Sequence, residues 1–205
     1  EDWTAPAREF FTGVAVGDRL AILPPWAPAD HPLARTPIVL RIDPGMAFGT
    51  GTHESTRLAL GWLLDCVQPG HAVLDLGAGS AVLAIAAAKV GATPVIAVEI
   101  DPQAEDNARR NLALNGVSQL VDYRVADFLT EPLGAADVVV CNTLIELFEP
   151  NLRRLRDLTR PGGALILAGL LVADEAALTS SLQAAGLTDF ELRREGEWSS
   201  ACVKR

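Results

Sequence analysis

Hydrophobic and polar positions alternate along the chain in two distinct patterns. From position 38 onward, short apolar runs alternate with longer amphipathic or alanine-rich stretches, a pattern typical of strands and helices in turn. The alternation predicts an α/β fold built on a doubly wound, seven-stranded and mostly parallel sheet. The last two runs flank Glu195-Gly196-Glu197 and predict a C-terminal antiparallel hairpin. The apolar runs that predict the strands are 72–74, 95–99, 121–125, 137–141, 164–168, 190–194 and 198–203.

The first 37 residues differ from the rest because they hold six of the 13 prolines and only short apolar runs. Val14 to Val16 and Leu20 to Leu23 are separated by Gly17-Asp18-Arg19, which predicts a small hairpin. A segment this short cannot bury a core of its own. We therefore expect residues 1–37 to be a linker or N-terminal extension, and residues 38–205 to form the main domain.

The chain is organised around residues 72–83, where an apolar run gives way to two glycines and then to an alanine-rich helix. Strand, glycine turn and helix together bring backbone N–H groups against a ligand. A dinucleotide site requires a third glycine at position 82, which is Val82 here. Glu99 ends the next predicted strand, 20 residues beyond Gly79, where a carboxylate can accept hydrogen bonds from a ribose diol. The plainer interpretation is an ordinary βαβ unit with a solvated Glu99.

A second candidate ligand segment precedes this turn, at residues 43–56. Three glycines within seven residues, interleaved with Met46, Phe48 and hydroxyl side chains, favour a ligand loop over core packing. We expect Thr52 to cap the amphipathic helix over 58–67, with Ser55 and Thr56 in its first turn. A capped helix after a flexible turn explains the same residues without a ligand.

These two segments carry a resemblance to a known family. The run Asp75-x-Gly77-x-Gly79-x-Ala81 resembles motif I of class I methyltransferases that use S-adenosylmethionine. The run from Pro44 to His53, with Thr56 behind it, resembles the signature of the ribosomal protein L-eleven methyltransferase family. The resemblance extends from about residue 38 to the C-terminus. It implies a Rossmann-like S-adenosylmethionine-dependent methyltransferase domain over residues 38–205.

The resemblance also implies a function. Members of this family methylate lysine side chains and the N-terminal amine of one large-subunit ribosomal protein, so the implied cofactor is S-adenosyl-L-methionine and the implied partner is a basic ribosomal protein. The family carries an N-terminal recognition domain, for which this chain has no room, so we expect the chain to be the catalytic domain. The alternatives are a methyltransferase for another protein or a small molecule, and a noncatalytic cofactor-binding module.

Residue roles follow from the resemblance as well. Asn142 ends a predicted strand, where it is expected both to contact the cofactor and to hold the incoming amine as the catalytic residue. Asp127 either contacts the adenine amine or caps a helix, and both interpretations remain open. The expected cofactor-binding residues are Phe48, Thr50, Gly51, Thr56, Asp75, Gly77, Gly79, Glu99, Asp127 and Asn142.

Apart from Glu54, which stands where proline is common, the chain departs from the family pattern at two places. Ala81 replaces the usual third motif-I glycine, a mild change if the backbone there is helical. After Asn142 the chain continues Thr143-Leu144-Ile145-Glu146, which matches the family's own version only loosely. The second departure concerns the substrate more than the cofactor.

Between the predicted strands 95–99 and 121–125 lies a polar helix. Asp101-Pro102 predicts its start and Gly116 its end. Asn107, Asn111 and Asn115 recur at intervals of four residues, and we expect this stripe to be a solvated helix face.

Composition excludes several classes of protein. A net charge of −9 disfavours direct nucleic-acid binding and suits a basic partner. No apolar run approaches the roughly 20 residues of a membrane span, and no signal peptide is evident, so we expect a cytoplasmic protein without membrane association. Three widely spaced cysteines, Cys66, Cys141 and Cys202, argue for a reducing compartment and, with the three histidines, suggest no metal site. The oligomeric state is not predicted.

Overall fold

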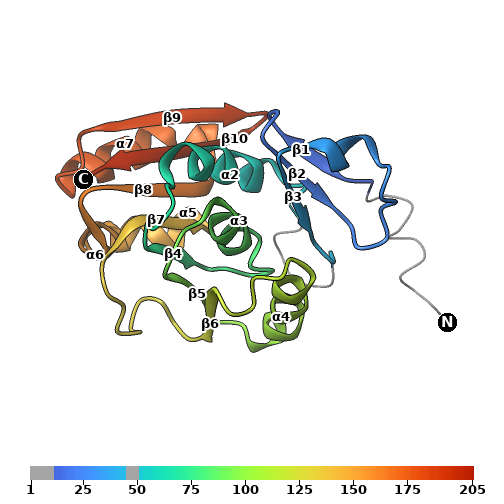
Figure 1. The fold of residues 1–205 in the computed structure, drawn as a ribbon. Coiled ribbons are helices and arrows are strands. Elements are labelled where there is room, and N and C mark those ends of the chain that lie inside the picture. Colours follow the sequence, from blue (N-terminus) through green and yellow to red (C-terminus); the bar gives the residue numbers. More distant parts are fainter. Residues whose placement is uncertain (1–11, 45–50) are drawn as a thin grey trace.

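The computed structural model describes residues 12–44 and 51–205, which form a seven-stranded sheet covered by helices on both faces and a separate three-stranded sheet (Figure 1). The strands are β1 (Val14–Val16), β2 (Leu20–Leu23), β3 (Ile38–Arg41), β4 (Val73–Leu76), β5 (Val95–Glu99), β6 (Val121–Val125), β7 (Ala136–Asn142), β8 (Thr159–Leu171), β9 (Phe190–Glu195) and β10 (Trp198–Lys204). The α-helices are α2 (Glu54–Cys66), α3 (Val82–Val90), α4 (Glu105–Leu114), α5 (Ile145–Phe148), α6 (Leu152–Leu158) and α7 (Glu175–Ala184).

The large sheet has the strand order β6-β5-β4-β7-β8-β10-β9. Six strands run in one direction, and β10 runs antiparallel to both of its neighbours, β8 and β9. The chain moves outward from β4 through β5 to β6 and then returns to place β7 on the other side of β4. The predicted α/β class, the seven strands and the C-terminal hairpin are thus confirmed. The reversal creates a switch point between β4 and β7, where ligands of open α/β sheets bind.

Alternate side chains along each strand pack into two separate hydrophobic cores, because successive side chains of a strand lie on opposite faces of the sheet. Val73 and Val140 face the core shared with α2, α3 and α4, whereas Leu74 and Val139 face the core under α5, α6 and α7. Both faces are therefore buried, which explains why these strands are continuous apolar runs.

The strand β8 extends beyond the predicted run 164–168. The sequence pattern Pro161-Gly162-Gly163 predicts a turn that leads into this strand. Pairing with β7 passes from Thr159 directly to Ala164, so these three residues lie inside β8 as an irregular, bulged stretch. Gly162 has a φ of +80° there.

The predicted N-terminal hairpin is confirmed, with β1 and β2 antiparallel and Val14 opposite Ile22. β3 then adds to β2 in parallel, so the small sheet joins residues on both sides of position 37. Leu20, Ile22 and Leu40 bury their side chains in the core beneath α2 and α3. The division of the chain at residue 37 stays a prediction.

The helix α2 begins four residues before the predicted range. Its N-cap is His53 and not Thr52, because His53 Nδ1 accepts a hydrogen bond from the Ser55 N–H at 3.3 Å. An imidazole is a less common cap than a hydroxyl, which is why the sequence pattern favoured the threonine.

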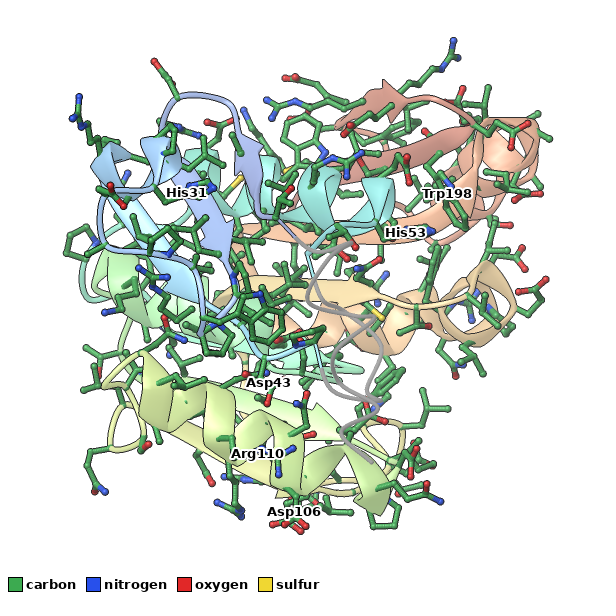
Figure 2. The ribbon with its side chains drawn as sticks, turned by 90° about the vertical axis from the view of Figure 1, so that its right-hand side faces the viewer. His31, Asp43, His53, Asp106, Arg110 and Trp198 are labelled. Carbon is green, nitrogen blue, oxygen red and sulfur yellow. The ribbon has the colours of Figure 1, made fainter. Side chains whose placement is uncertain are left out.

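The asparagine stripe of α4 is buried, which corrects the expectation of a solvated face. Asn115 accepts from the Arg41 N–H at 2.9 Å and donates to the Arg41 carbonyl at 2.7 Å. Asn111 accepts from the Asp43 N–H at 2.8 Å and donates to the Ser80 carbonyl at 3.2 Å. The side-chain amides of Asn111 and Asn115 thus form hydrogen bonds with the backbone at and just after the end of β3, as the backbone of a neighbouring strand would. Figure 2 shows Asp43 beside this helix.

Candidate functional site

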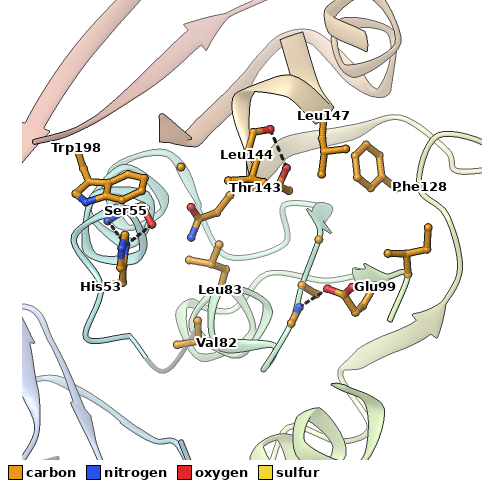
Figure 3. A pocket seen from close by; sticks show the side chains of 16 residues that line it. His53, Ser55, Val82, Leu83, Glu99, Phe128, Thr143, Leu144, Leu147 and Trp198 are labelled. Atoms are coloured by element: carbon orange, nitrogen blue, oxygen red, sulfur yellow. Dashed lines mark hydrogen bonds between the residues drawn. The ribbon is translucent and has the colours of Figure 1, made fainter. Parts of the chain in front are cut away.

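A pocket of about 390 Å³ opens at the carboxyl ends of β4, β5, β7 and β8, at the switch point of the sheet (Figure 3). Its volume lies within the range of ligand-binding sites, and most of its lining is apolar. Trp198 and His53 stand at one end, and Glu99 and Phe128 at the other. The pocket is lined by His53, Ser55, Gly77, Ala78, Gly79, Val82, Leu83, Glu99, Ile100, Phe128, Asn142, Thr143, Leu144, Leu147, Gly169 and Trp198.

The glycine turn after β4 is tied to the carboxylate that ends β5. Glu99 accepts from the Gly79 N–H at 2.8 Å through Oε2, and from the Asp101 N–H at 2.9 Å through Oε1. Each carboxylate oxygen keeps lone pairs for a ligand donor, since it can accept more than one hydrogen bond. From the neighbouring strand β6, the Tyr123 hydroxyl donates to the Gly79 carbonyl at 3.0 Å. The turn and its acid are therefore fixed relative to each other.

Asp75 lies behind the turn and does not line the pocket. Its Oδ2 accepts from the Ala84 N–H at 2.9 Å, so it satisfies one of the free donors in the first turn of α3. Its Oδ1 has no hydrogen-bond partner among the described residues. Complete burial raises the pKa of Asp75 to about 7, the Ala84 hydrogen bond opposes the shift, and the nearby Glu99 charge adds to it. Asp75 thus supports the site through α3.

Ala81, the replacement for the third motif-I glycine, has a φ of +66° and lies in the left-handed region. The condition under which this replacement would be mild, a helical backbone at position 81, is therefore not met. A left-handed conformation costs an L-residue roughly 1–2 kcal/mol. The surrounding packing holds it there, since Ala81 is fully buried and its carbonyl accepts from Ile85 at 2.8 Å.

At the end where Glu99 lies, the pocket forms a slot with apolar walls. Figure 3 shows Phe128 beside Leu147 at the same end of the pocket as Glu99, with Glu99 on the facing wall. Ile100, directly after Glu99, is 66% exposed, and Leu144 is 63% exposed. Apolar walls above a carboxylate suit a flat ring joined to a sugar, because the ring is buried while the sugar hydroxyls reach the acid.

The other half of the pocket brings together segments that are far apart in the sequence. Asn142, at the end of β7, donates through Nδ2 to the Thr56 hydroxyl at 3.3 Å, which leaves Oδ1 as the acceptor atom of the amide. His53 Nδ1 lies 2.8 Å from the Ser55 hydroxyl. The His53 ring meets the Trp198 ring edge to face at 4.4 Å between centroids, and Figure 2 shows the two side by side.

The structure brings together four of the ten residues expected to bind cofactor. Gly77, Gly79, Glu99 and Asn142 line the pocket. Thr56 and Asp75 lie behind the lining and hold residues or helices that form it. These assignments to cofactor binding stay predictions, as does the catalytic role of Asn142.

Two further expected residues, Gly51 and Asp127, do not line the pocket. Gly51 is buried with a φ of +84°, and a side chain there would overlap Ile22 of β2. Asp127 accepts from the Leu129 N–H at 2.8 Å, which is the capping geometry of the second interpretation, although the helix is only a short turn. Its neighbour Phe128 lines the pocket instead. Phe48 and Thr50, together with Met46, fall outside the described residues.

The sequence pattern did not predict several of the lining residues. Gly169 carried a usable signal, and Trp198 did not. Gly169 interrupts the apolar run of β8, which marks a close approach of backbone, and that signal was available. Trp198 has no local signal, because it reaches the pocket only through the insertion of β10 beside β8.

The lining residues fit S-adenosylmethionine. Gly77 has a φ of +77°, and a Cβ there would lie 2.6 Å from the Thr143 Cγ2, so a side chain would fill the cradle after β4. Glu99 offers a fixed carboxylate, and the apolar slot adjoins it. A glycine cradle suits an amino-acid group, a fixed carboxylate suits a sugar diol and an apolar slot suits a flat ring.

Comparison with known proteins identifies the family. The family model of the ribosomal protein L11 methyltransferases (PrmA) matches residues 1–205. The chain belongs to this family. A ribosomal protein L11 methyltransferase of Pelobacter propionicus is 42% identical over 212 residues, covering 100% of the chain and 67% of the relative. One from Symbiobacterium thermophilum is 38% identical over 198 residues, covering 97% of the chain and 64% of the relative.

A solved structure of the same family has the same fold. The ribosomal protein L11 methylase of Lactobacillus delbrueckii subsp. bulgaricus superposes with a TM-score of 0.84 at 28% identity, covering 95% of this chain and 99% of that one. The chain spans 64% and 67% of the lengths of the two curated relatives described above, so about a third of each relative has no counterpart in it.

Two features are absent from the part of the chain that the structure describes. Among residues 12–44 and 51–205, no three histidine, cysteine or acidic side chains are grouped so that they could hold a metal ion. Within the same ranges, no helix combines the length and the apolar character needed to cross a membrane.

Proposed function

We propose that this chain is an S-adenosylmethionine-dependent protein methyltransferase domain that methylates lysine side chains and the N-terminal amine of ribosomal protein L11. The observation that carries the proposal is the pocket at the switch point of a chain belonging to this family, with Glu99 fixed to the glycine turn. The acidic balance of the chain, −9, suits a basic protein substrate.

When bound, S-adenosylmethionine supplies an electrophilic methyl group, so the protein need only bind, orient and exclude water. A lysine amine with its ordinary pKa of about 10.4 is well under about 1% neutral at pH 7. The amine must lose its proton before it can attack. A largely apolar pocket favours the neutral form, because burial penalises the ammonium.

Asn142 orients the neutral amine in this proposal. Its Nδ2 donates to the Thr56 hydroxyl, so Oδ1 is the amide atom that accepts a hydrogen bond from an N–H of the amine. Acceptance of that bond directs the nitrogen lone pair away from Asn142. The neighbouring Ser55 hydroxyl, held by His53 at 2.8 Å, supplies a second polar group at the same end of the pocket.

The test is methylation by the purified chain with labelled cofactor and a panel of basic proteins that includes ribosomal protein L11. We expect label in L11 at lysine and N-terminal amines, identified by mass spectrometry of its peptides. We also expect the purified chain to bind the cofactor in the absence of L11. Equal labelling of every basic protein at high concentration would overturn the proposed substrate. Absence of cofactor binding would overturn the whole proposal.

A further inference from the structure

The segment Asn142-Thr143-Leu144 leaves β7 between two glycines, one after the end of β4 and one within β8. Gly77 follows β4, and Gly169 lies in β8 at the register position after Ala168, which pairs with Asn142. All of these residues except Ala168 line the pocket. The segment therefore carries the proposed amine acceptor while its path is set from both sides.

The contact with Gly169 involves the backbone of Thr143. A Cβ at Gly169 would overlap the Thr143 carbonyl oxygen and lie 2.9 Å from its carbonyl carbon and 3.2 Å from its amide nitrogen. Backbone atoms cannot rotate away as a side-chain end can. A methyl group at position 169 therefore requires the segment itself to move.

The contact with Gly77 is of a different kind. A Cβ there would lie 2.6 Å from Thr143 Cγ2, which is the end of a side chain, and 3.7 Å from Thr143 Cβ. Removal of that methyl group relieves the overlap. The two glycines thus bound the same residue, one through its backbone and one through its side chain.

We propose that Gly169 is a positioning residue for methyl transfer, because only a residue without a side chain lets the Thr143 backbone pack this closely against β8, and this close packing sets the position of the neighbouring Asn142 amide. The inference rests on the proposed function for its effect on rate, whereas its structural part stands alone. A displacement of about 1 Å at a reacting centre can lower a rate roughly 100-fold. Cofactor affinity depends mainly on the β4–β5 end and should change little.

The matched control is Gly162, in the same strand. Gly162 and Gly169 have similar φ values, +80° and +89°, but a Cβ at Gly162 would have no described atom within 4 Å. Gly162→Ala therefore carries the conformational strain of an L-residue without the overlap. The difference between the two alanine variants isolates the displacement of Thr143.

The experiment compares both variants by hydrogen exchange over residues 142–147, cofactor binding and methylation rate. We expect Gly169→Ala to raise exchange in this segment and to lower kcat by about 10- to 100-fold, with cofactor Kd within about threefold of wild type. Gly162→Ala should leave all three near wild type. Equal effects of the two variants, or parallel losses of binding and rate in Gly169→Ala, would overturn the inference.

The experiment also gives an answer if wild type is inactive or if Gly169→Ala does not fold. If wild type binds no cofactor and transfers no methyl group, the proposed function fails, while the hydrogen-exchange comparison still decides whether Gly169 positions the segment. If Gly169→Ala does not fold, Gly77→Ala and its combination with Thr143→Ser replace it. Restored order of residues 142–147 in the double variant supports the positioning of Thr143 between the two glycines, and unchanged hydrogen exchange contradicts it.

A second feature, independent of the pocket, is a pair of thiols. Cys66 ends α2 and Cys202 lies in β10, 136 positions apart, with their sulfurs 3.6 Å from each other. Cys202 is 4% exposed and Cys66 is partly exposed. The hydrogen bond from Cys202 lowers the pKa of Cys66, and the Arg193 and Lys204 charges act in the same direction against burial and Asp65.

We propose that Cys66 and Cys202 form a site of reversible thiol–disulfide exchange with a low-molecular-weight disulfide. The Cys66 thiolate attacks one sulfur of the small disulfide and releases one thiol. The Cys202 sulfur then attacks Cys66 and releases the second, so the protein is oxidised by two electrons and the small disulfide is reduced to two thiols. The new bond would join the C-terminal end of α2 to β10.

The probe is oxidised glutathione, added to the chain and to the variants Cys66→Ser, Cys202→Ser and Cys141→Ser. We expect wild type and Cys141→Ser to lose two hydrogens in mass with a Cys66–Cys202 peptide link. Cys202→Ser should stop at a glutathione adduct on Cys66, and Cys66→Ser should remain unmodified. A persistent adduct in wild type, or a link to Cys141, would overturn the proposal.

Discussion

The two ends of the pocket are built in different ways. The end at β4 and β5 consists of backbone amides and one carboxylate, joined by hydrogen bonds of 2.8 and 2.9 Å within residues 77–101. The end at α2, β7 and β10 joins the side chains of His53, Asn142 and Trp198, which are far apart in the sequence. Changes at the first end should act on cofactor affinity, and changes at the second on the rate of transfer.

The largest expected effect concerns the support of the first end, at Asp75. Its pKa of about 7 lies above the unfolded value of 3.8, so the proton on folded Asp75 stabilises the protein fully below about pH 4 and this contribution is lost as the pH rises through 7. Asp75→Asn lacks that dependence. Its free energy of unfolding relative to wild type should rise by up to about 4 kcal/mol between pH 4 and 8, measured by urea unfolding.

The control for this titration is Asp137→Asn. The Ala72 N–H and the Arg160 guanidinium hold the pKa of Asp137 below its usual value, so its contribution is present above that value and lost as the pH falls. The relative stability of this variant should therefore change with pH in the opposite direction. Parallel pH profiles for the two variants would show that Asp75 does not carry a raised pKa.

Glu99→Ala tests the first end directly. The variant loses an acceptor for the ribose hydroxyls and the ties to Gly79 and Asp101. Cofactor affinity should fall roughly 100-fold, or about 3 kcal/mol, by calorimetry. Glu191→Ala, at an exposed position of β9, is the control. Wild-type affinity in a folded Glu99→Ala variant would remove this carboxylate from the site.

Asn142→Ala tests the second end. If its amide orients the amine, kcat should fall by about 10- to 100-fold while cofactor Kd changes less than about threefold. Thr56→Val removes the hydroxyl that accepts from Asn142 and should give a smaller loss in kcat alone. Parallel losses of affinity and rate in Asn142→Ala would mean that the two ends do not divide the work in this way.

The smallest effect is expected from the substitution Ala81→Gly, beneath the first end. Ala81→Gly relieves a left-handed conformation but loosens the unfolded chain, so the net change in stability should be under about 1 kcal/mol. Ala81→Val should be strongly destabilising, because a β-branched residue is a poor fit at a φ of +66°. Thermal unfolding of both variants separates the two cases. Similar melting temperatures would show that the strain is absent.

The same division explains what the sequence could predict. The β4–turn–α3 unit and the Asp101-Pro102 helix start depend on neighbours in the chain, and the structure bears them out. The asparagine stripe of α4 looked solvated because its partners, residues 41–43, lie about 70 positions earlier. Trp198 and the role of Gly169 depend on which strands become neighbours, which no local pattern specifies.

The place of β10 has a consequence for the order in which the chain is made. Synthesis yields β8 and β9 first, yet β9 joins the sheet only through β10, and β8 has β10 as its second neighbour. Until residues 198–204 emerge from the ribosome, β8 presents an open edge and β9 has no strand to pair with. Open edges invite pairing with other chains. Trp198 enters the pocket with this strand, so the growing protein finishes its sheet and its site in the same step.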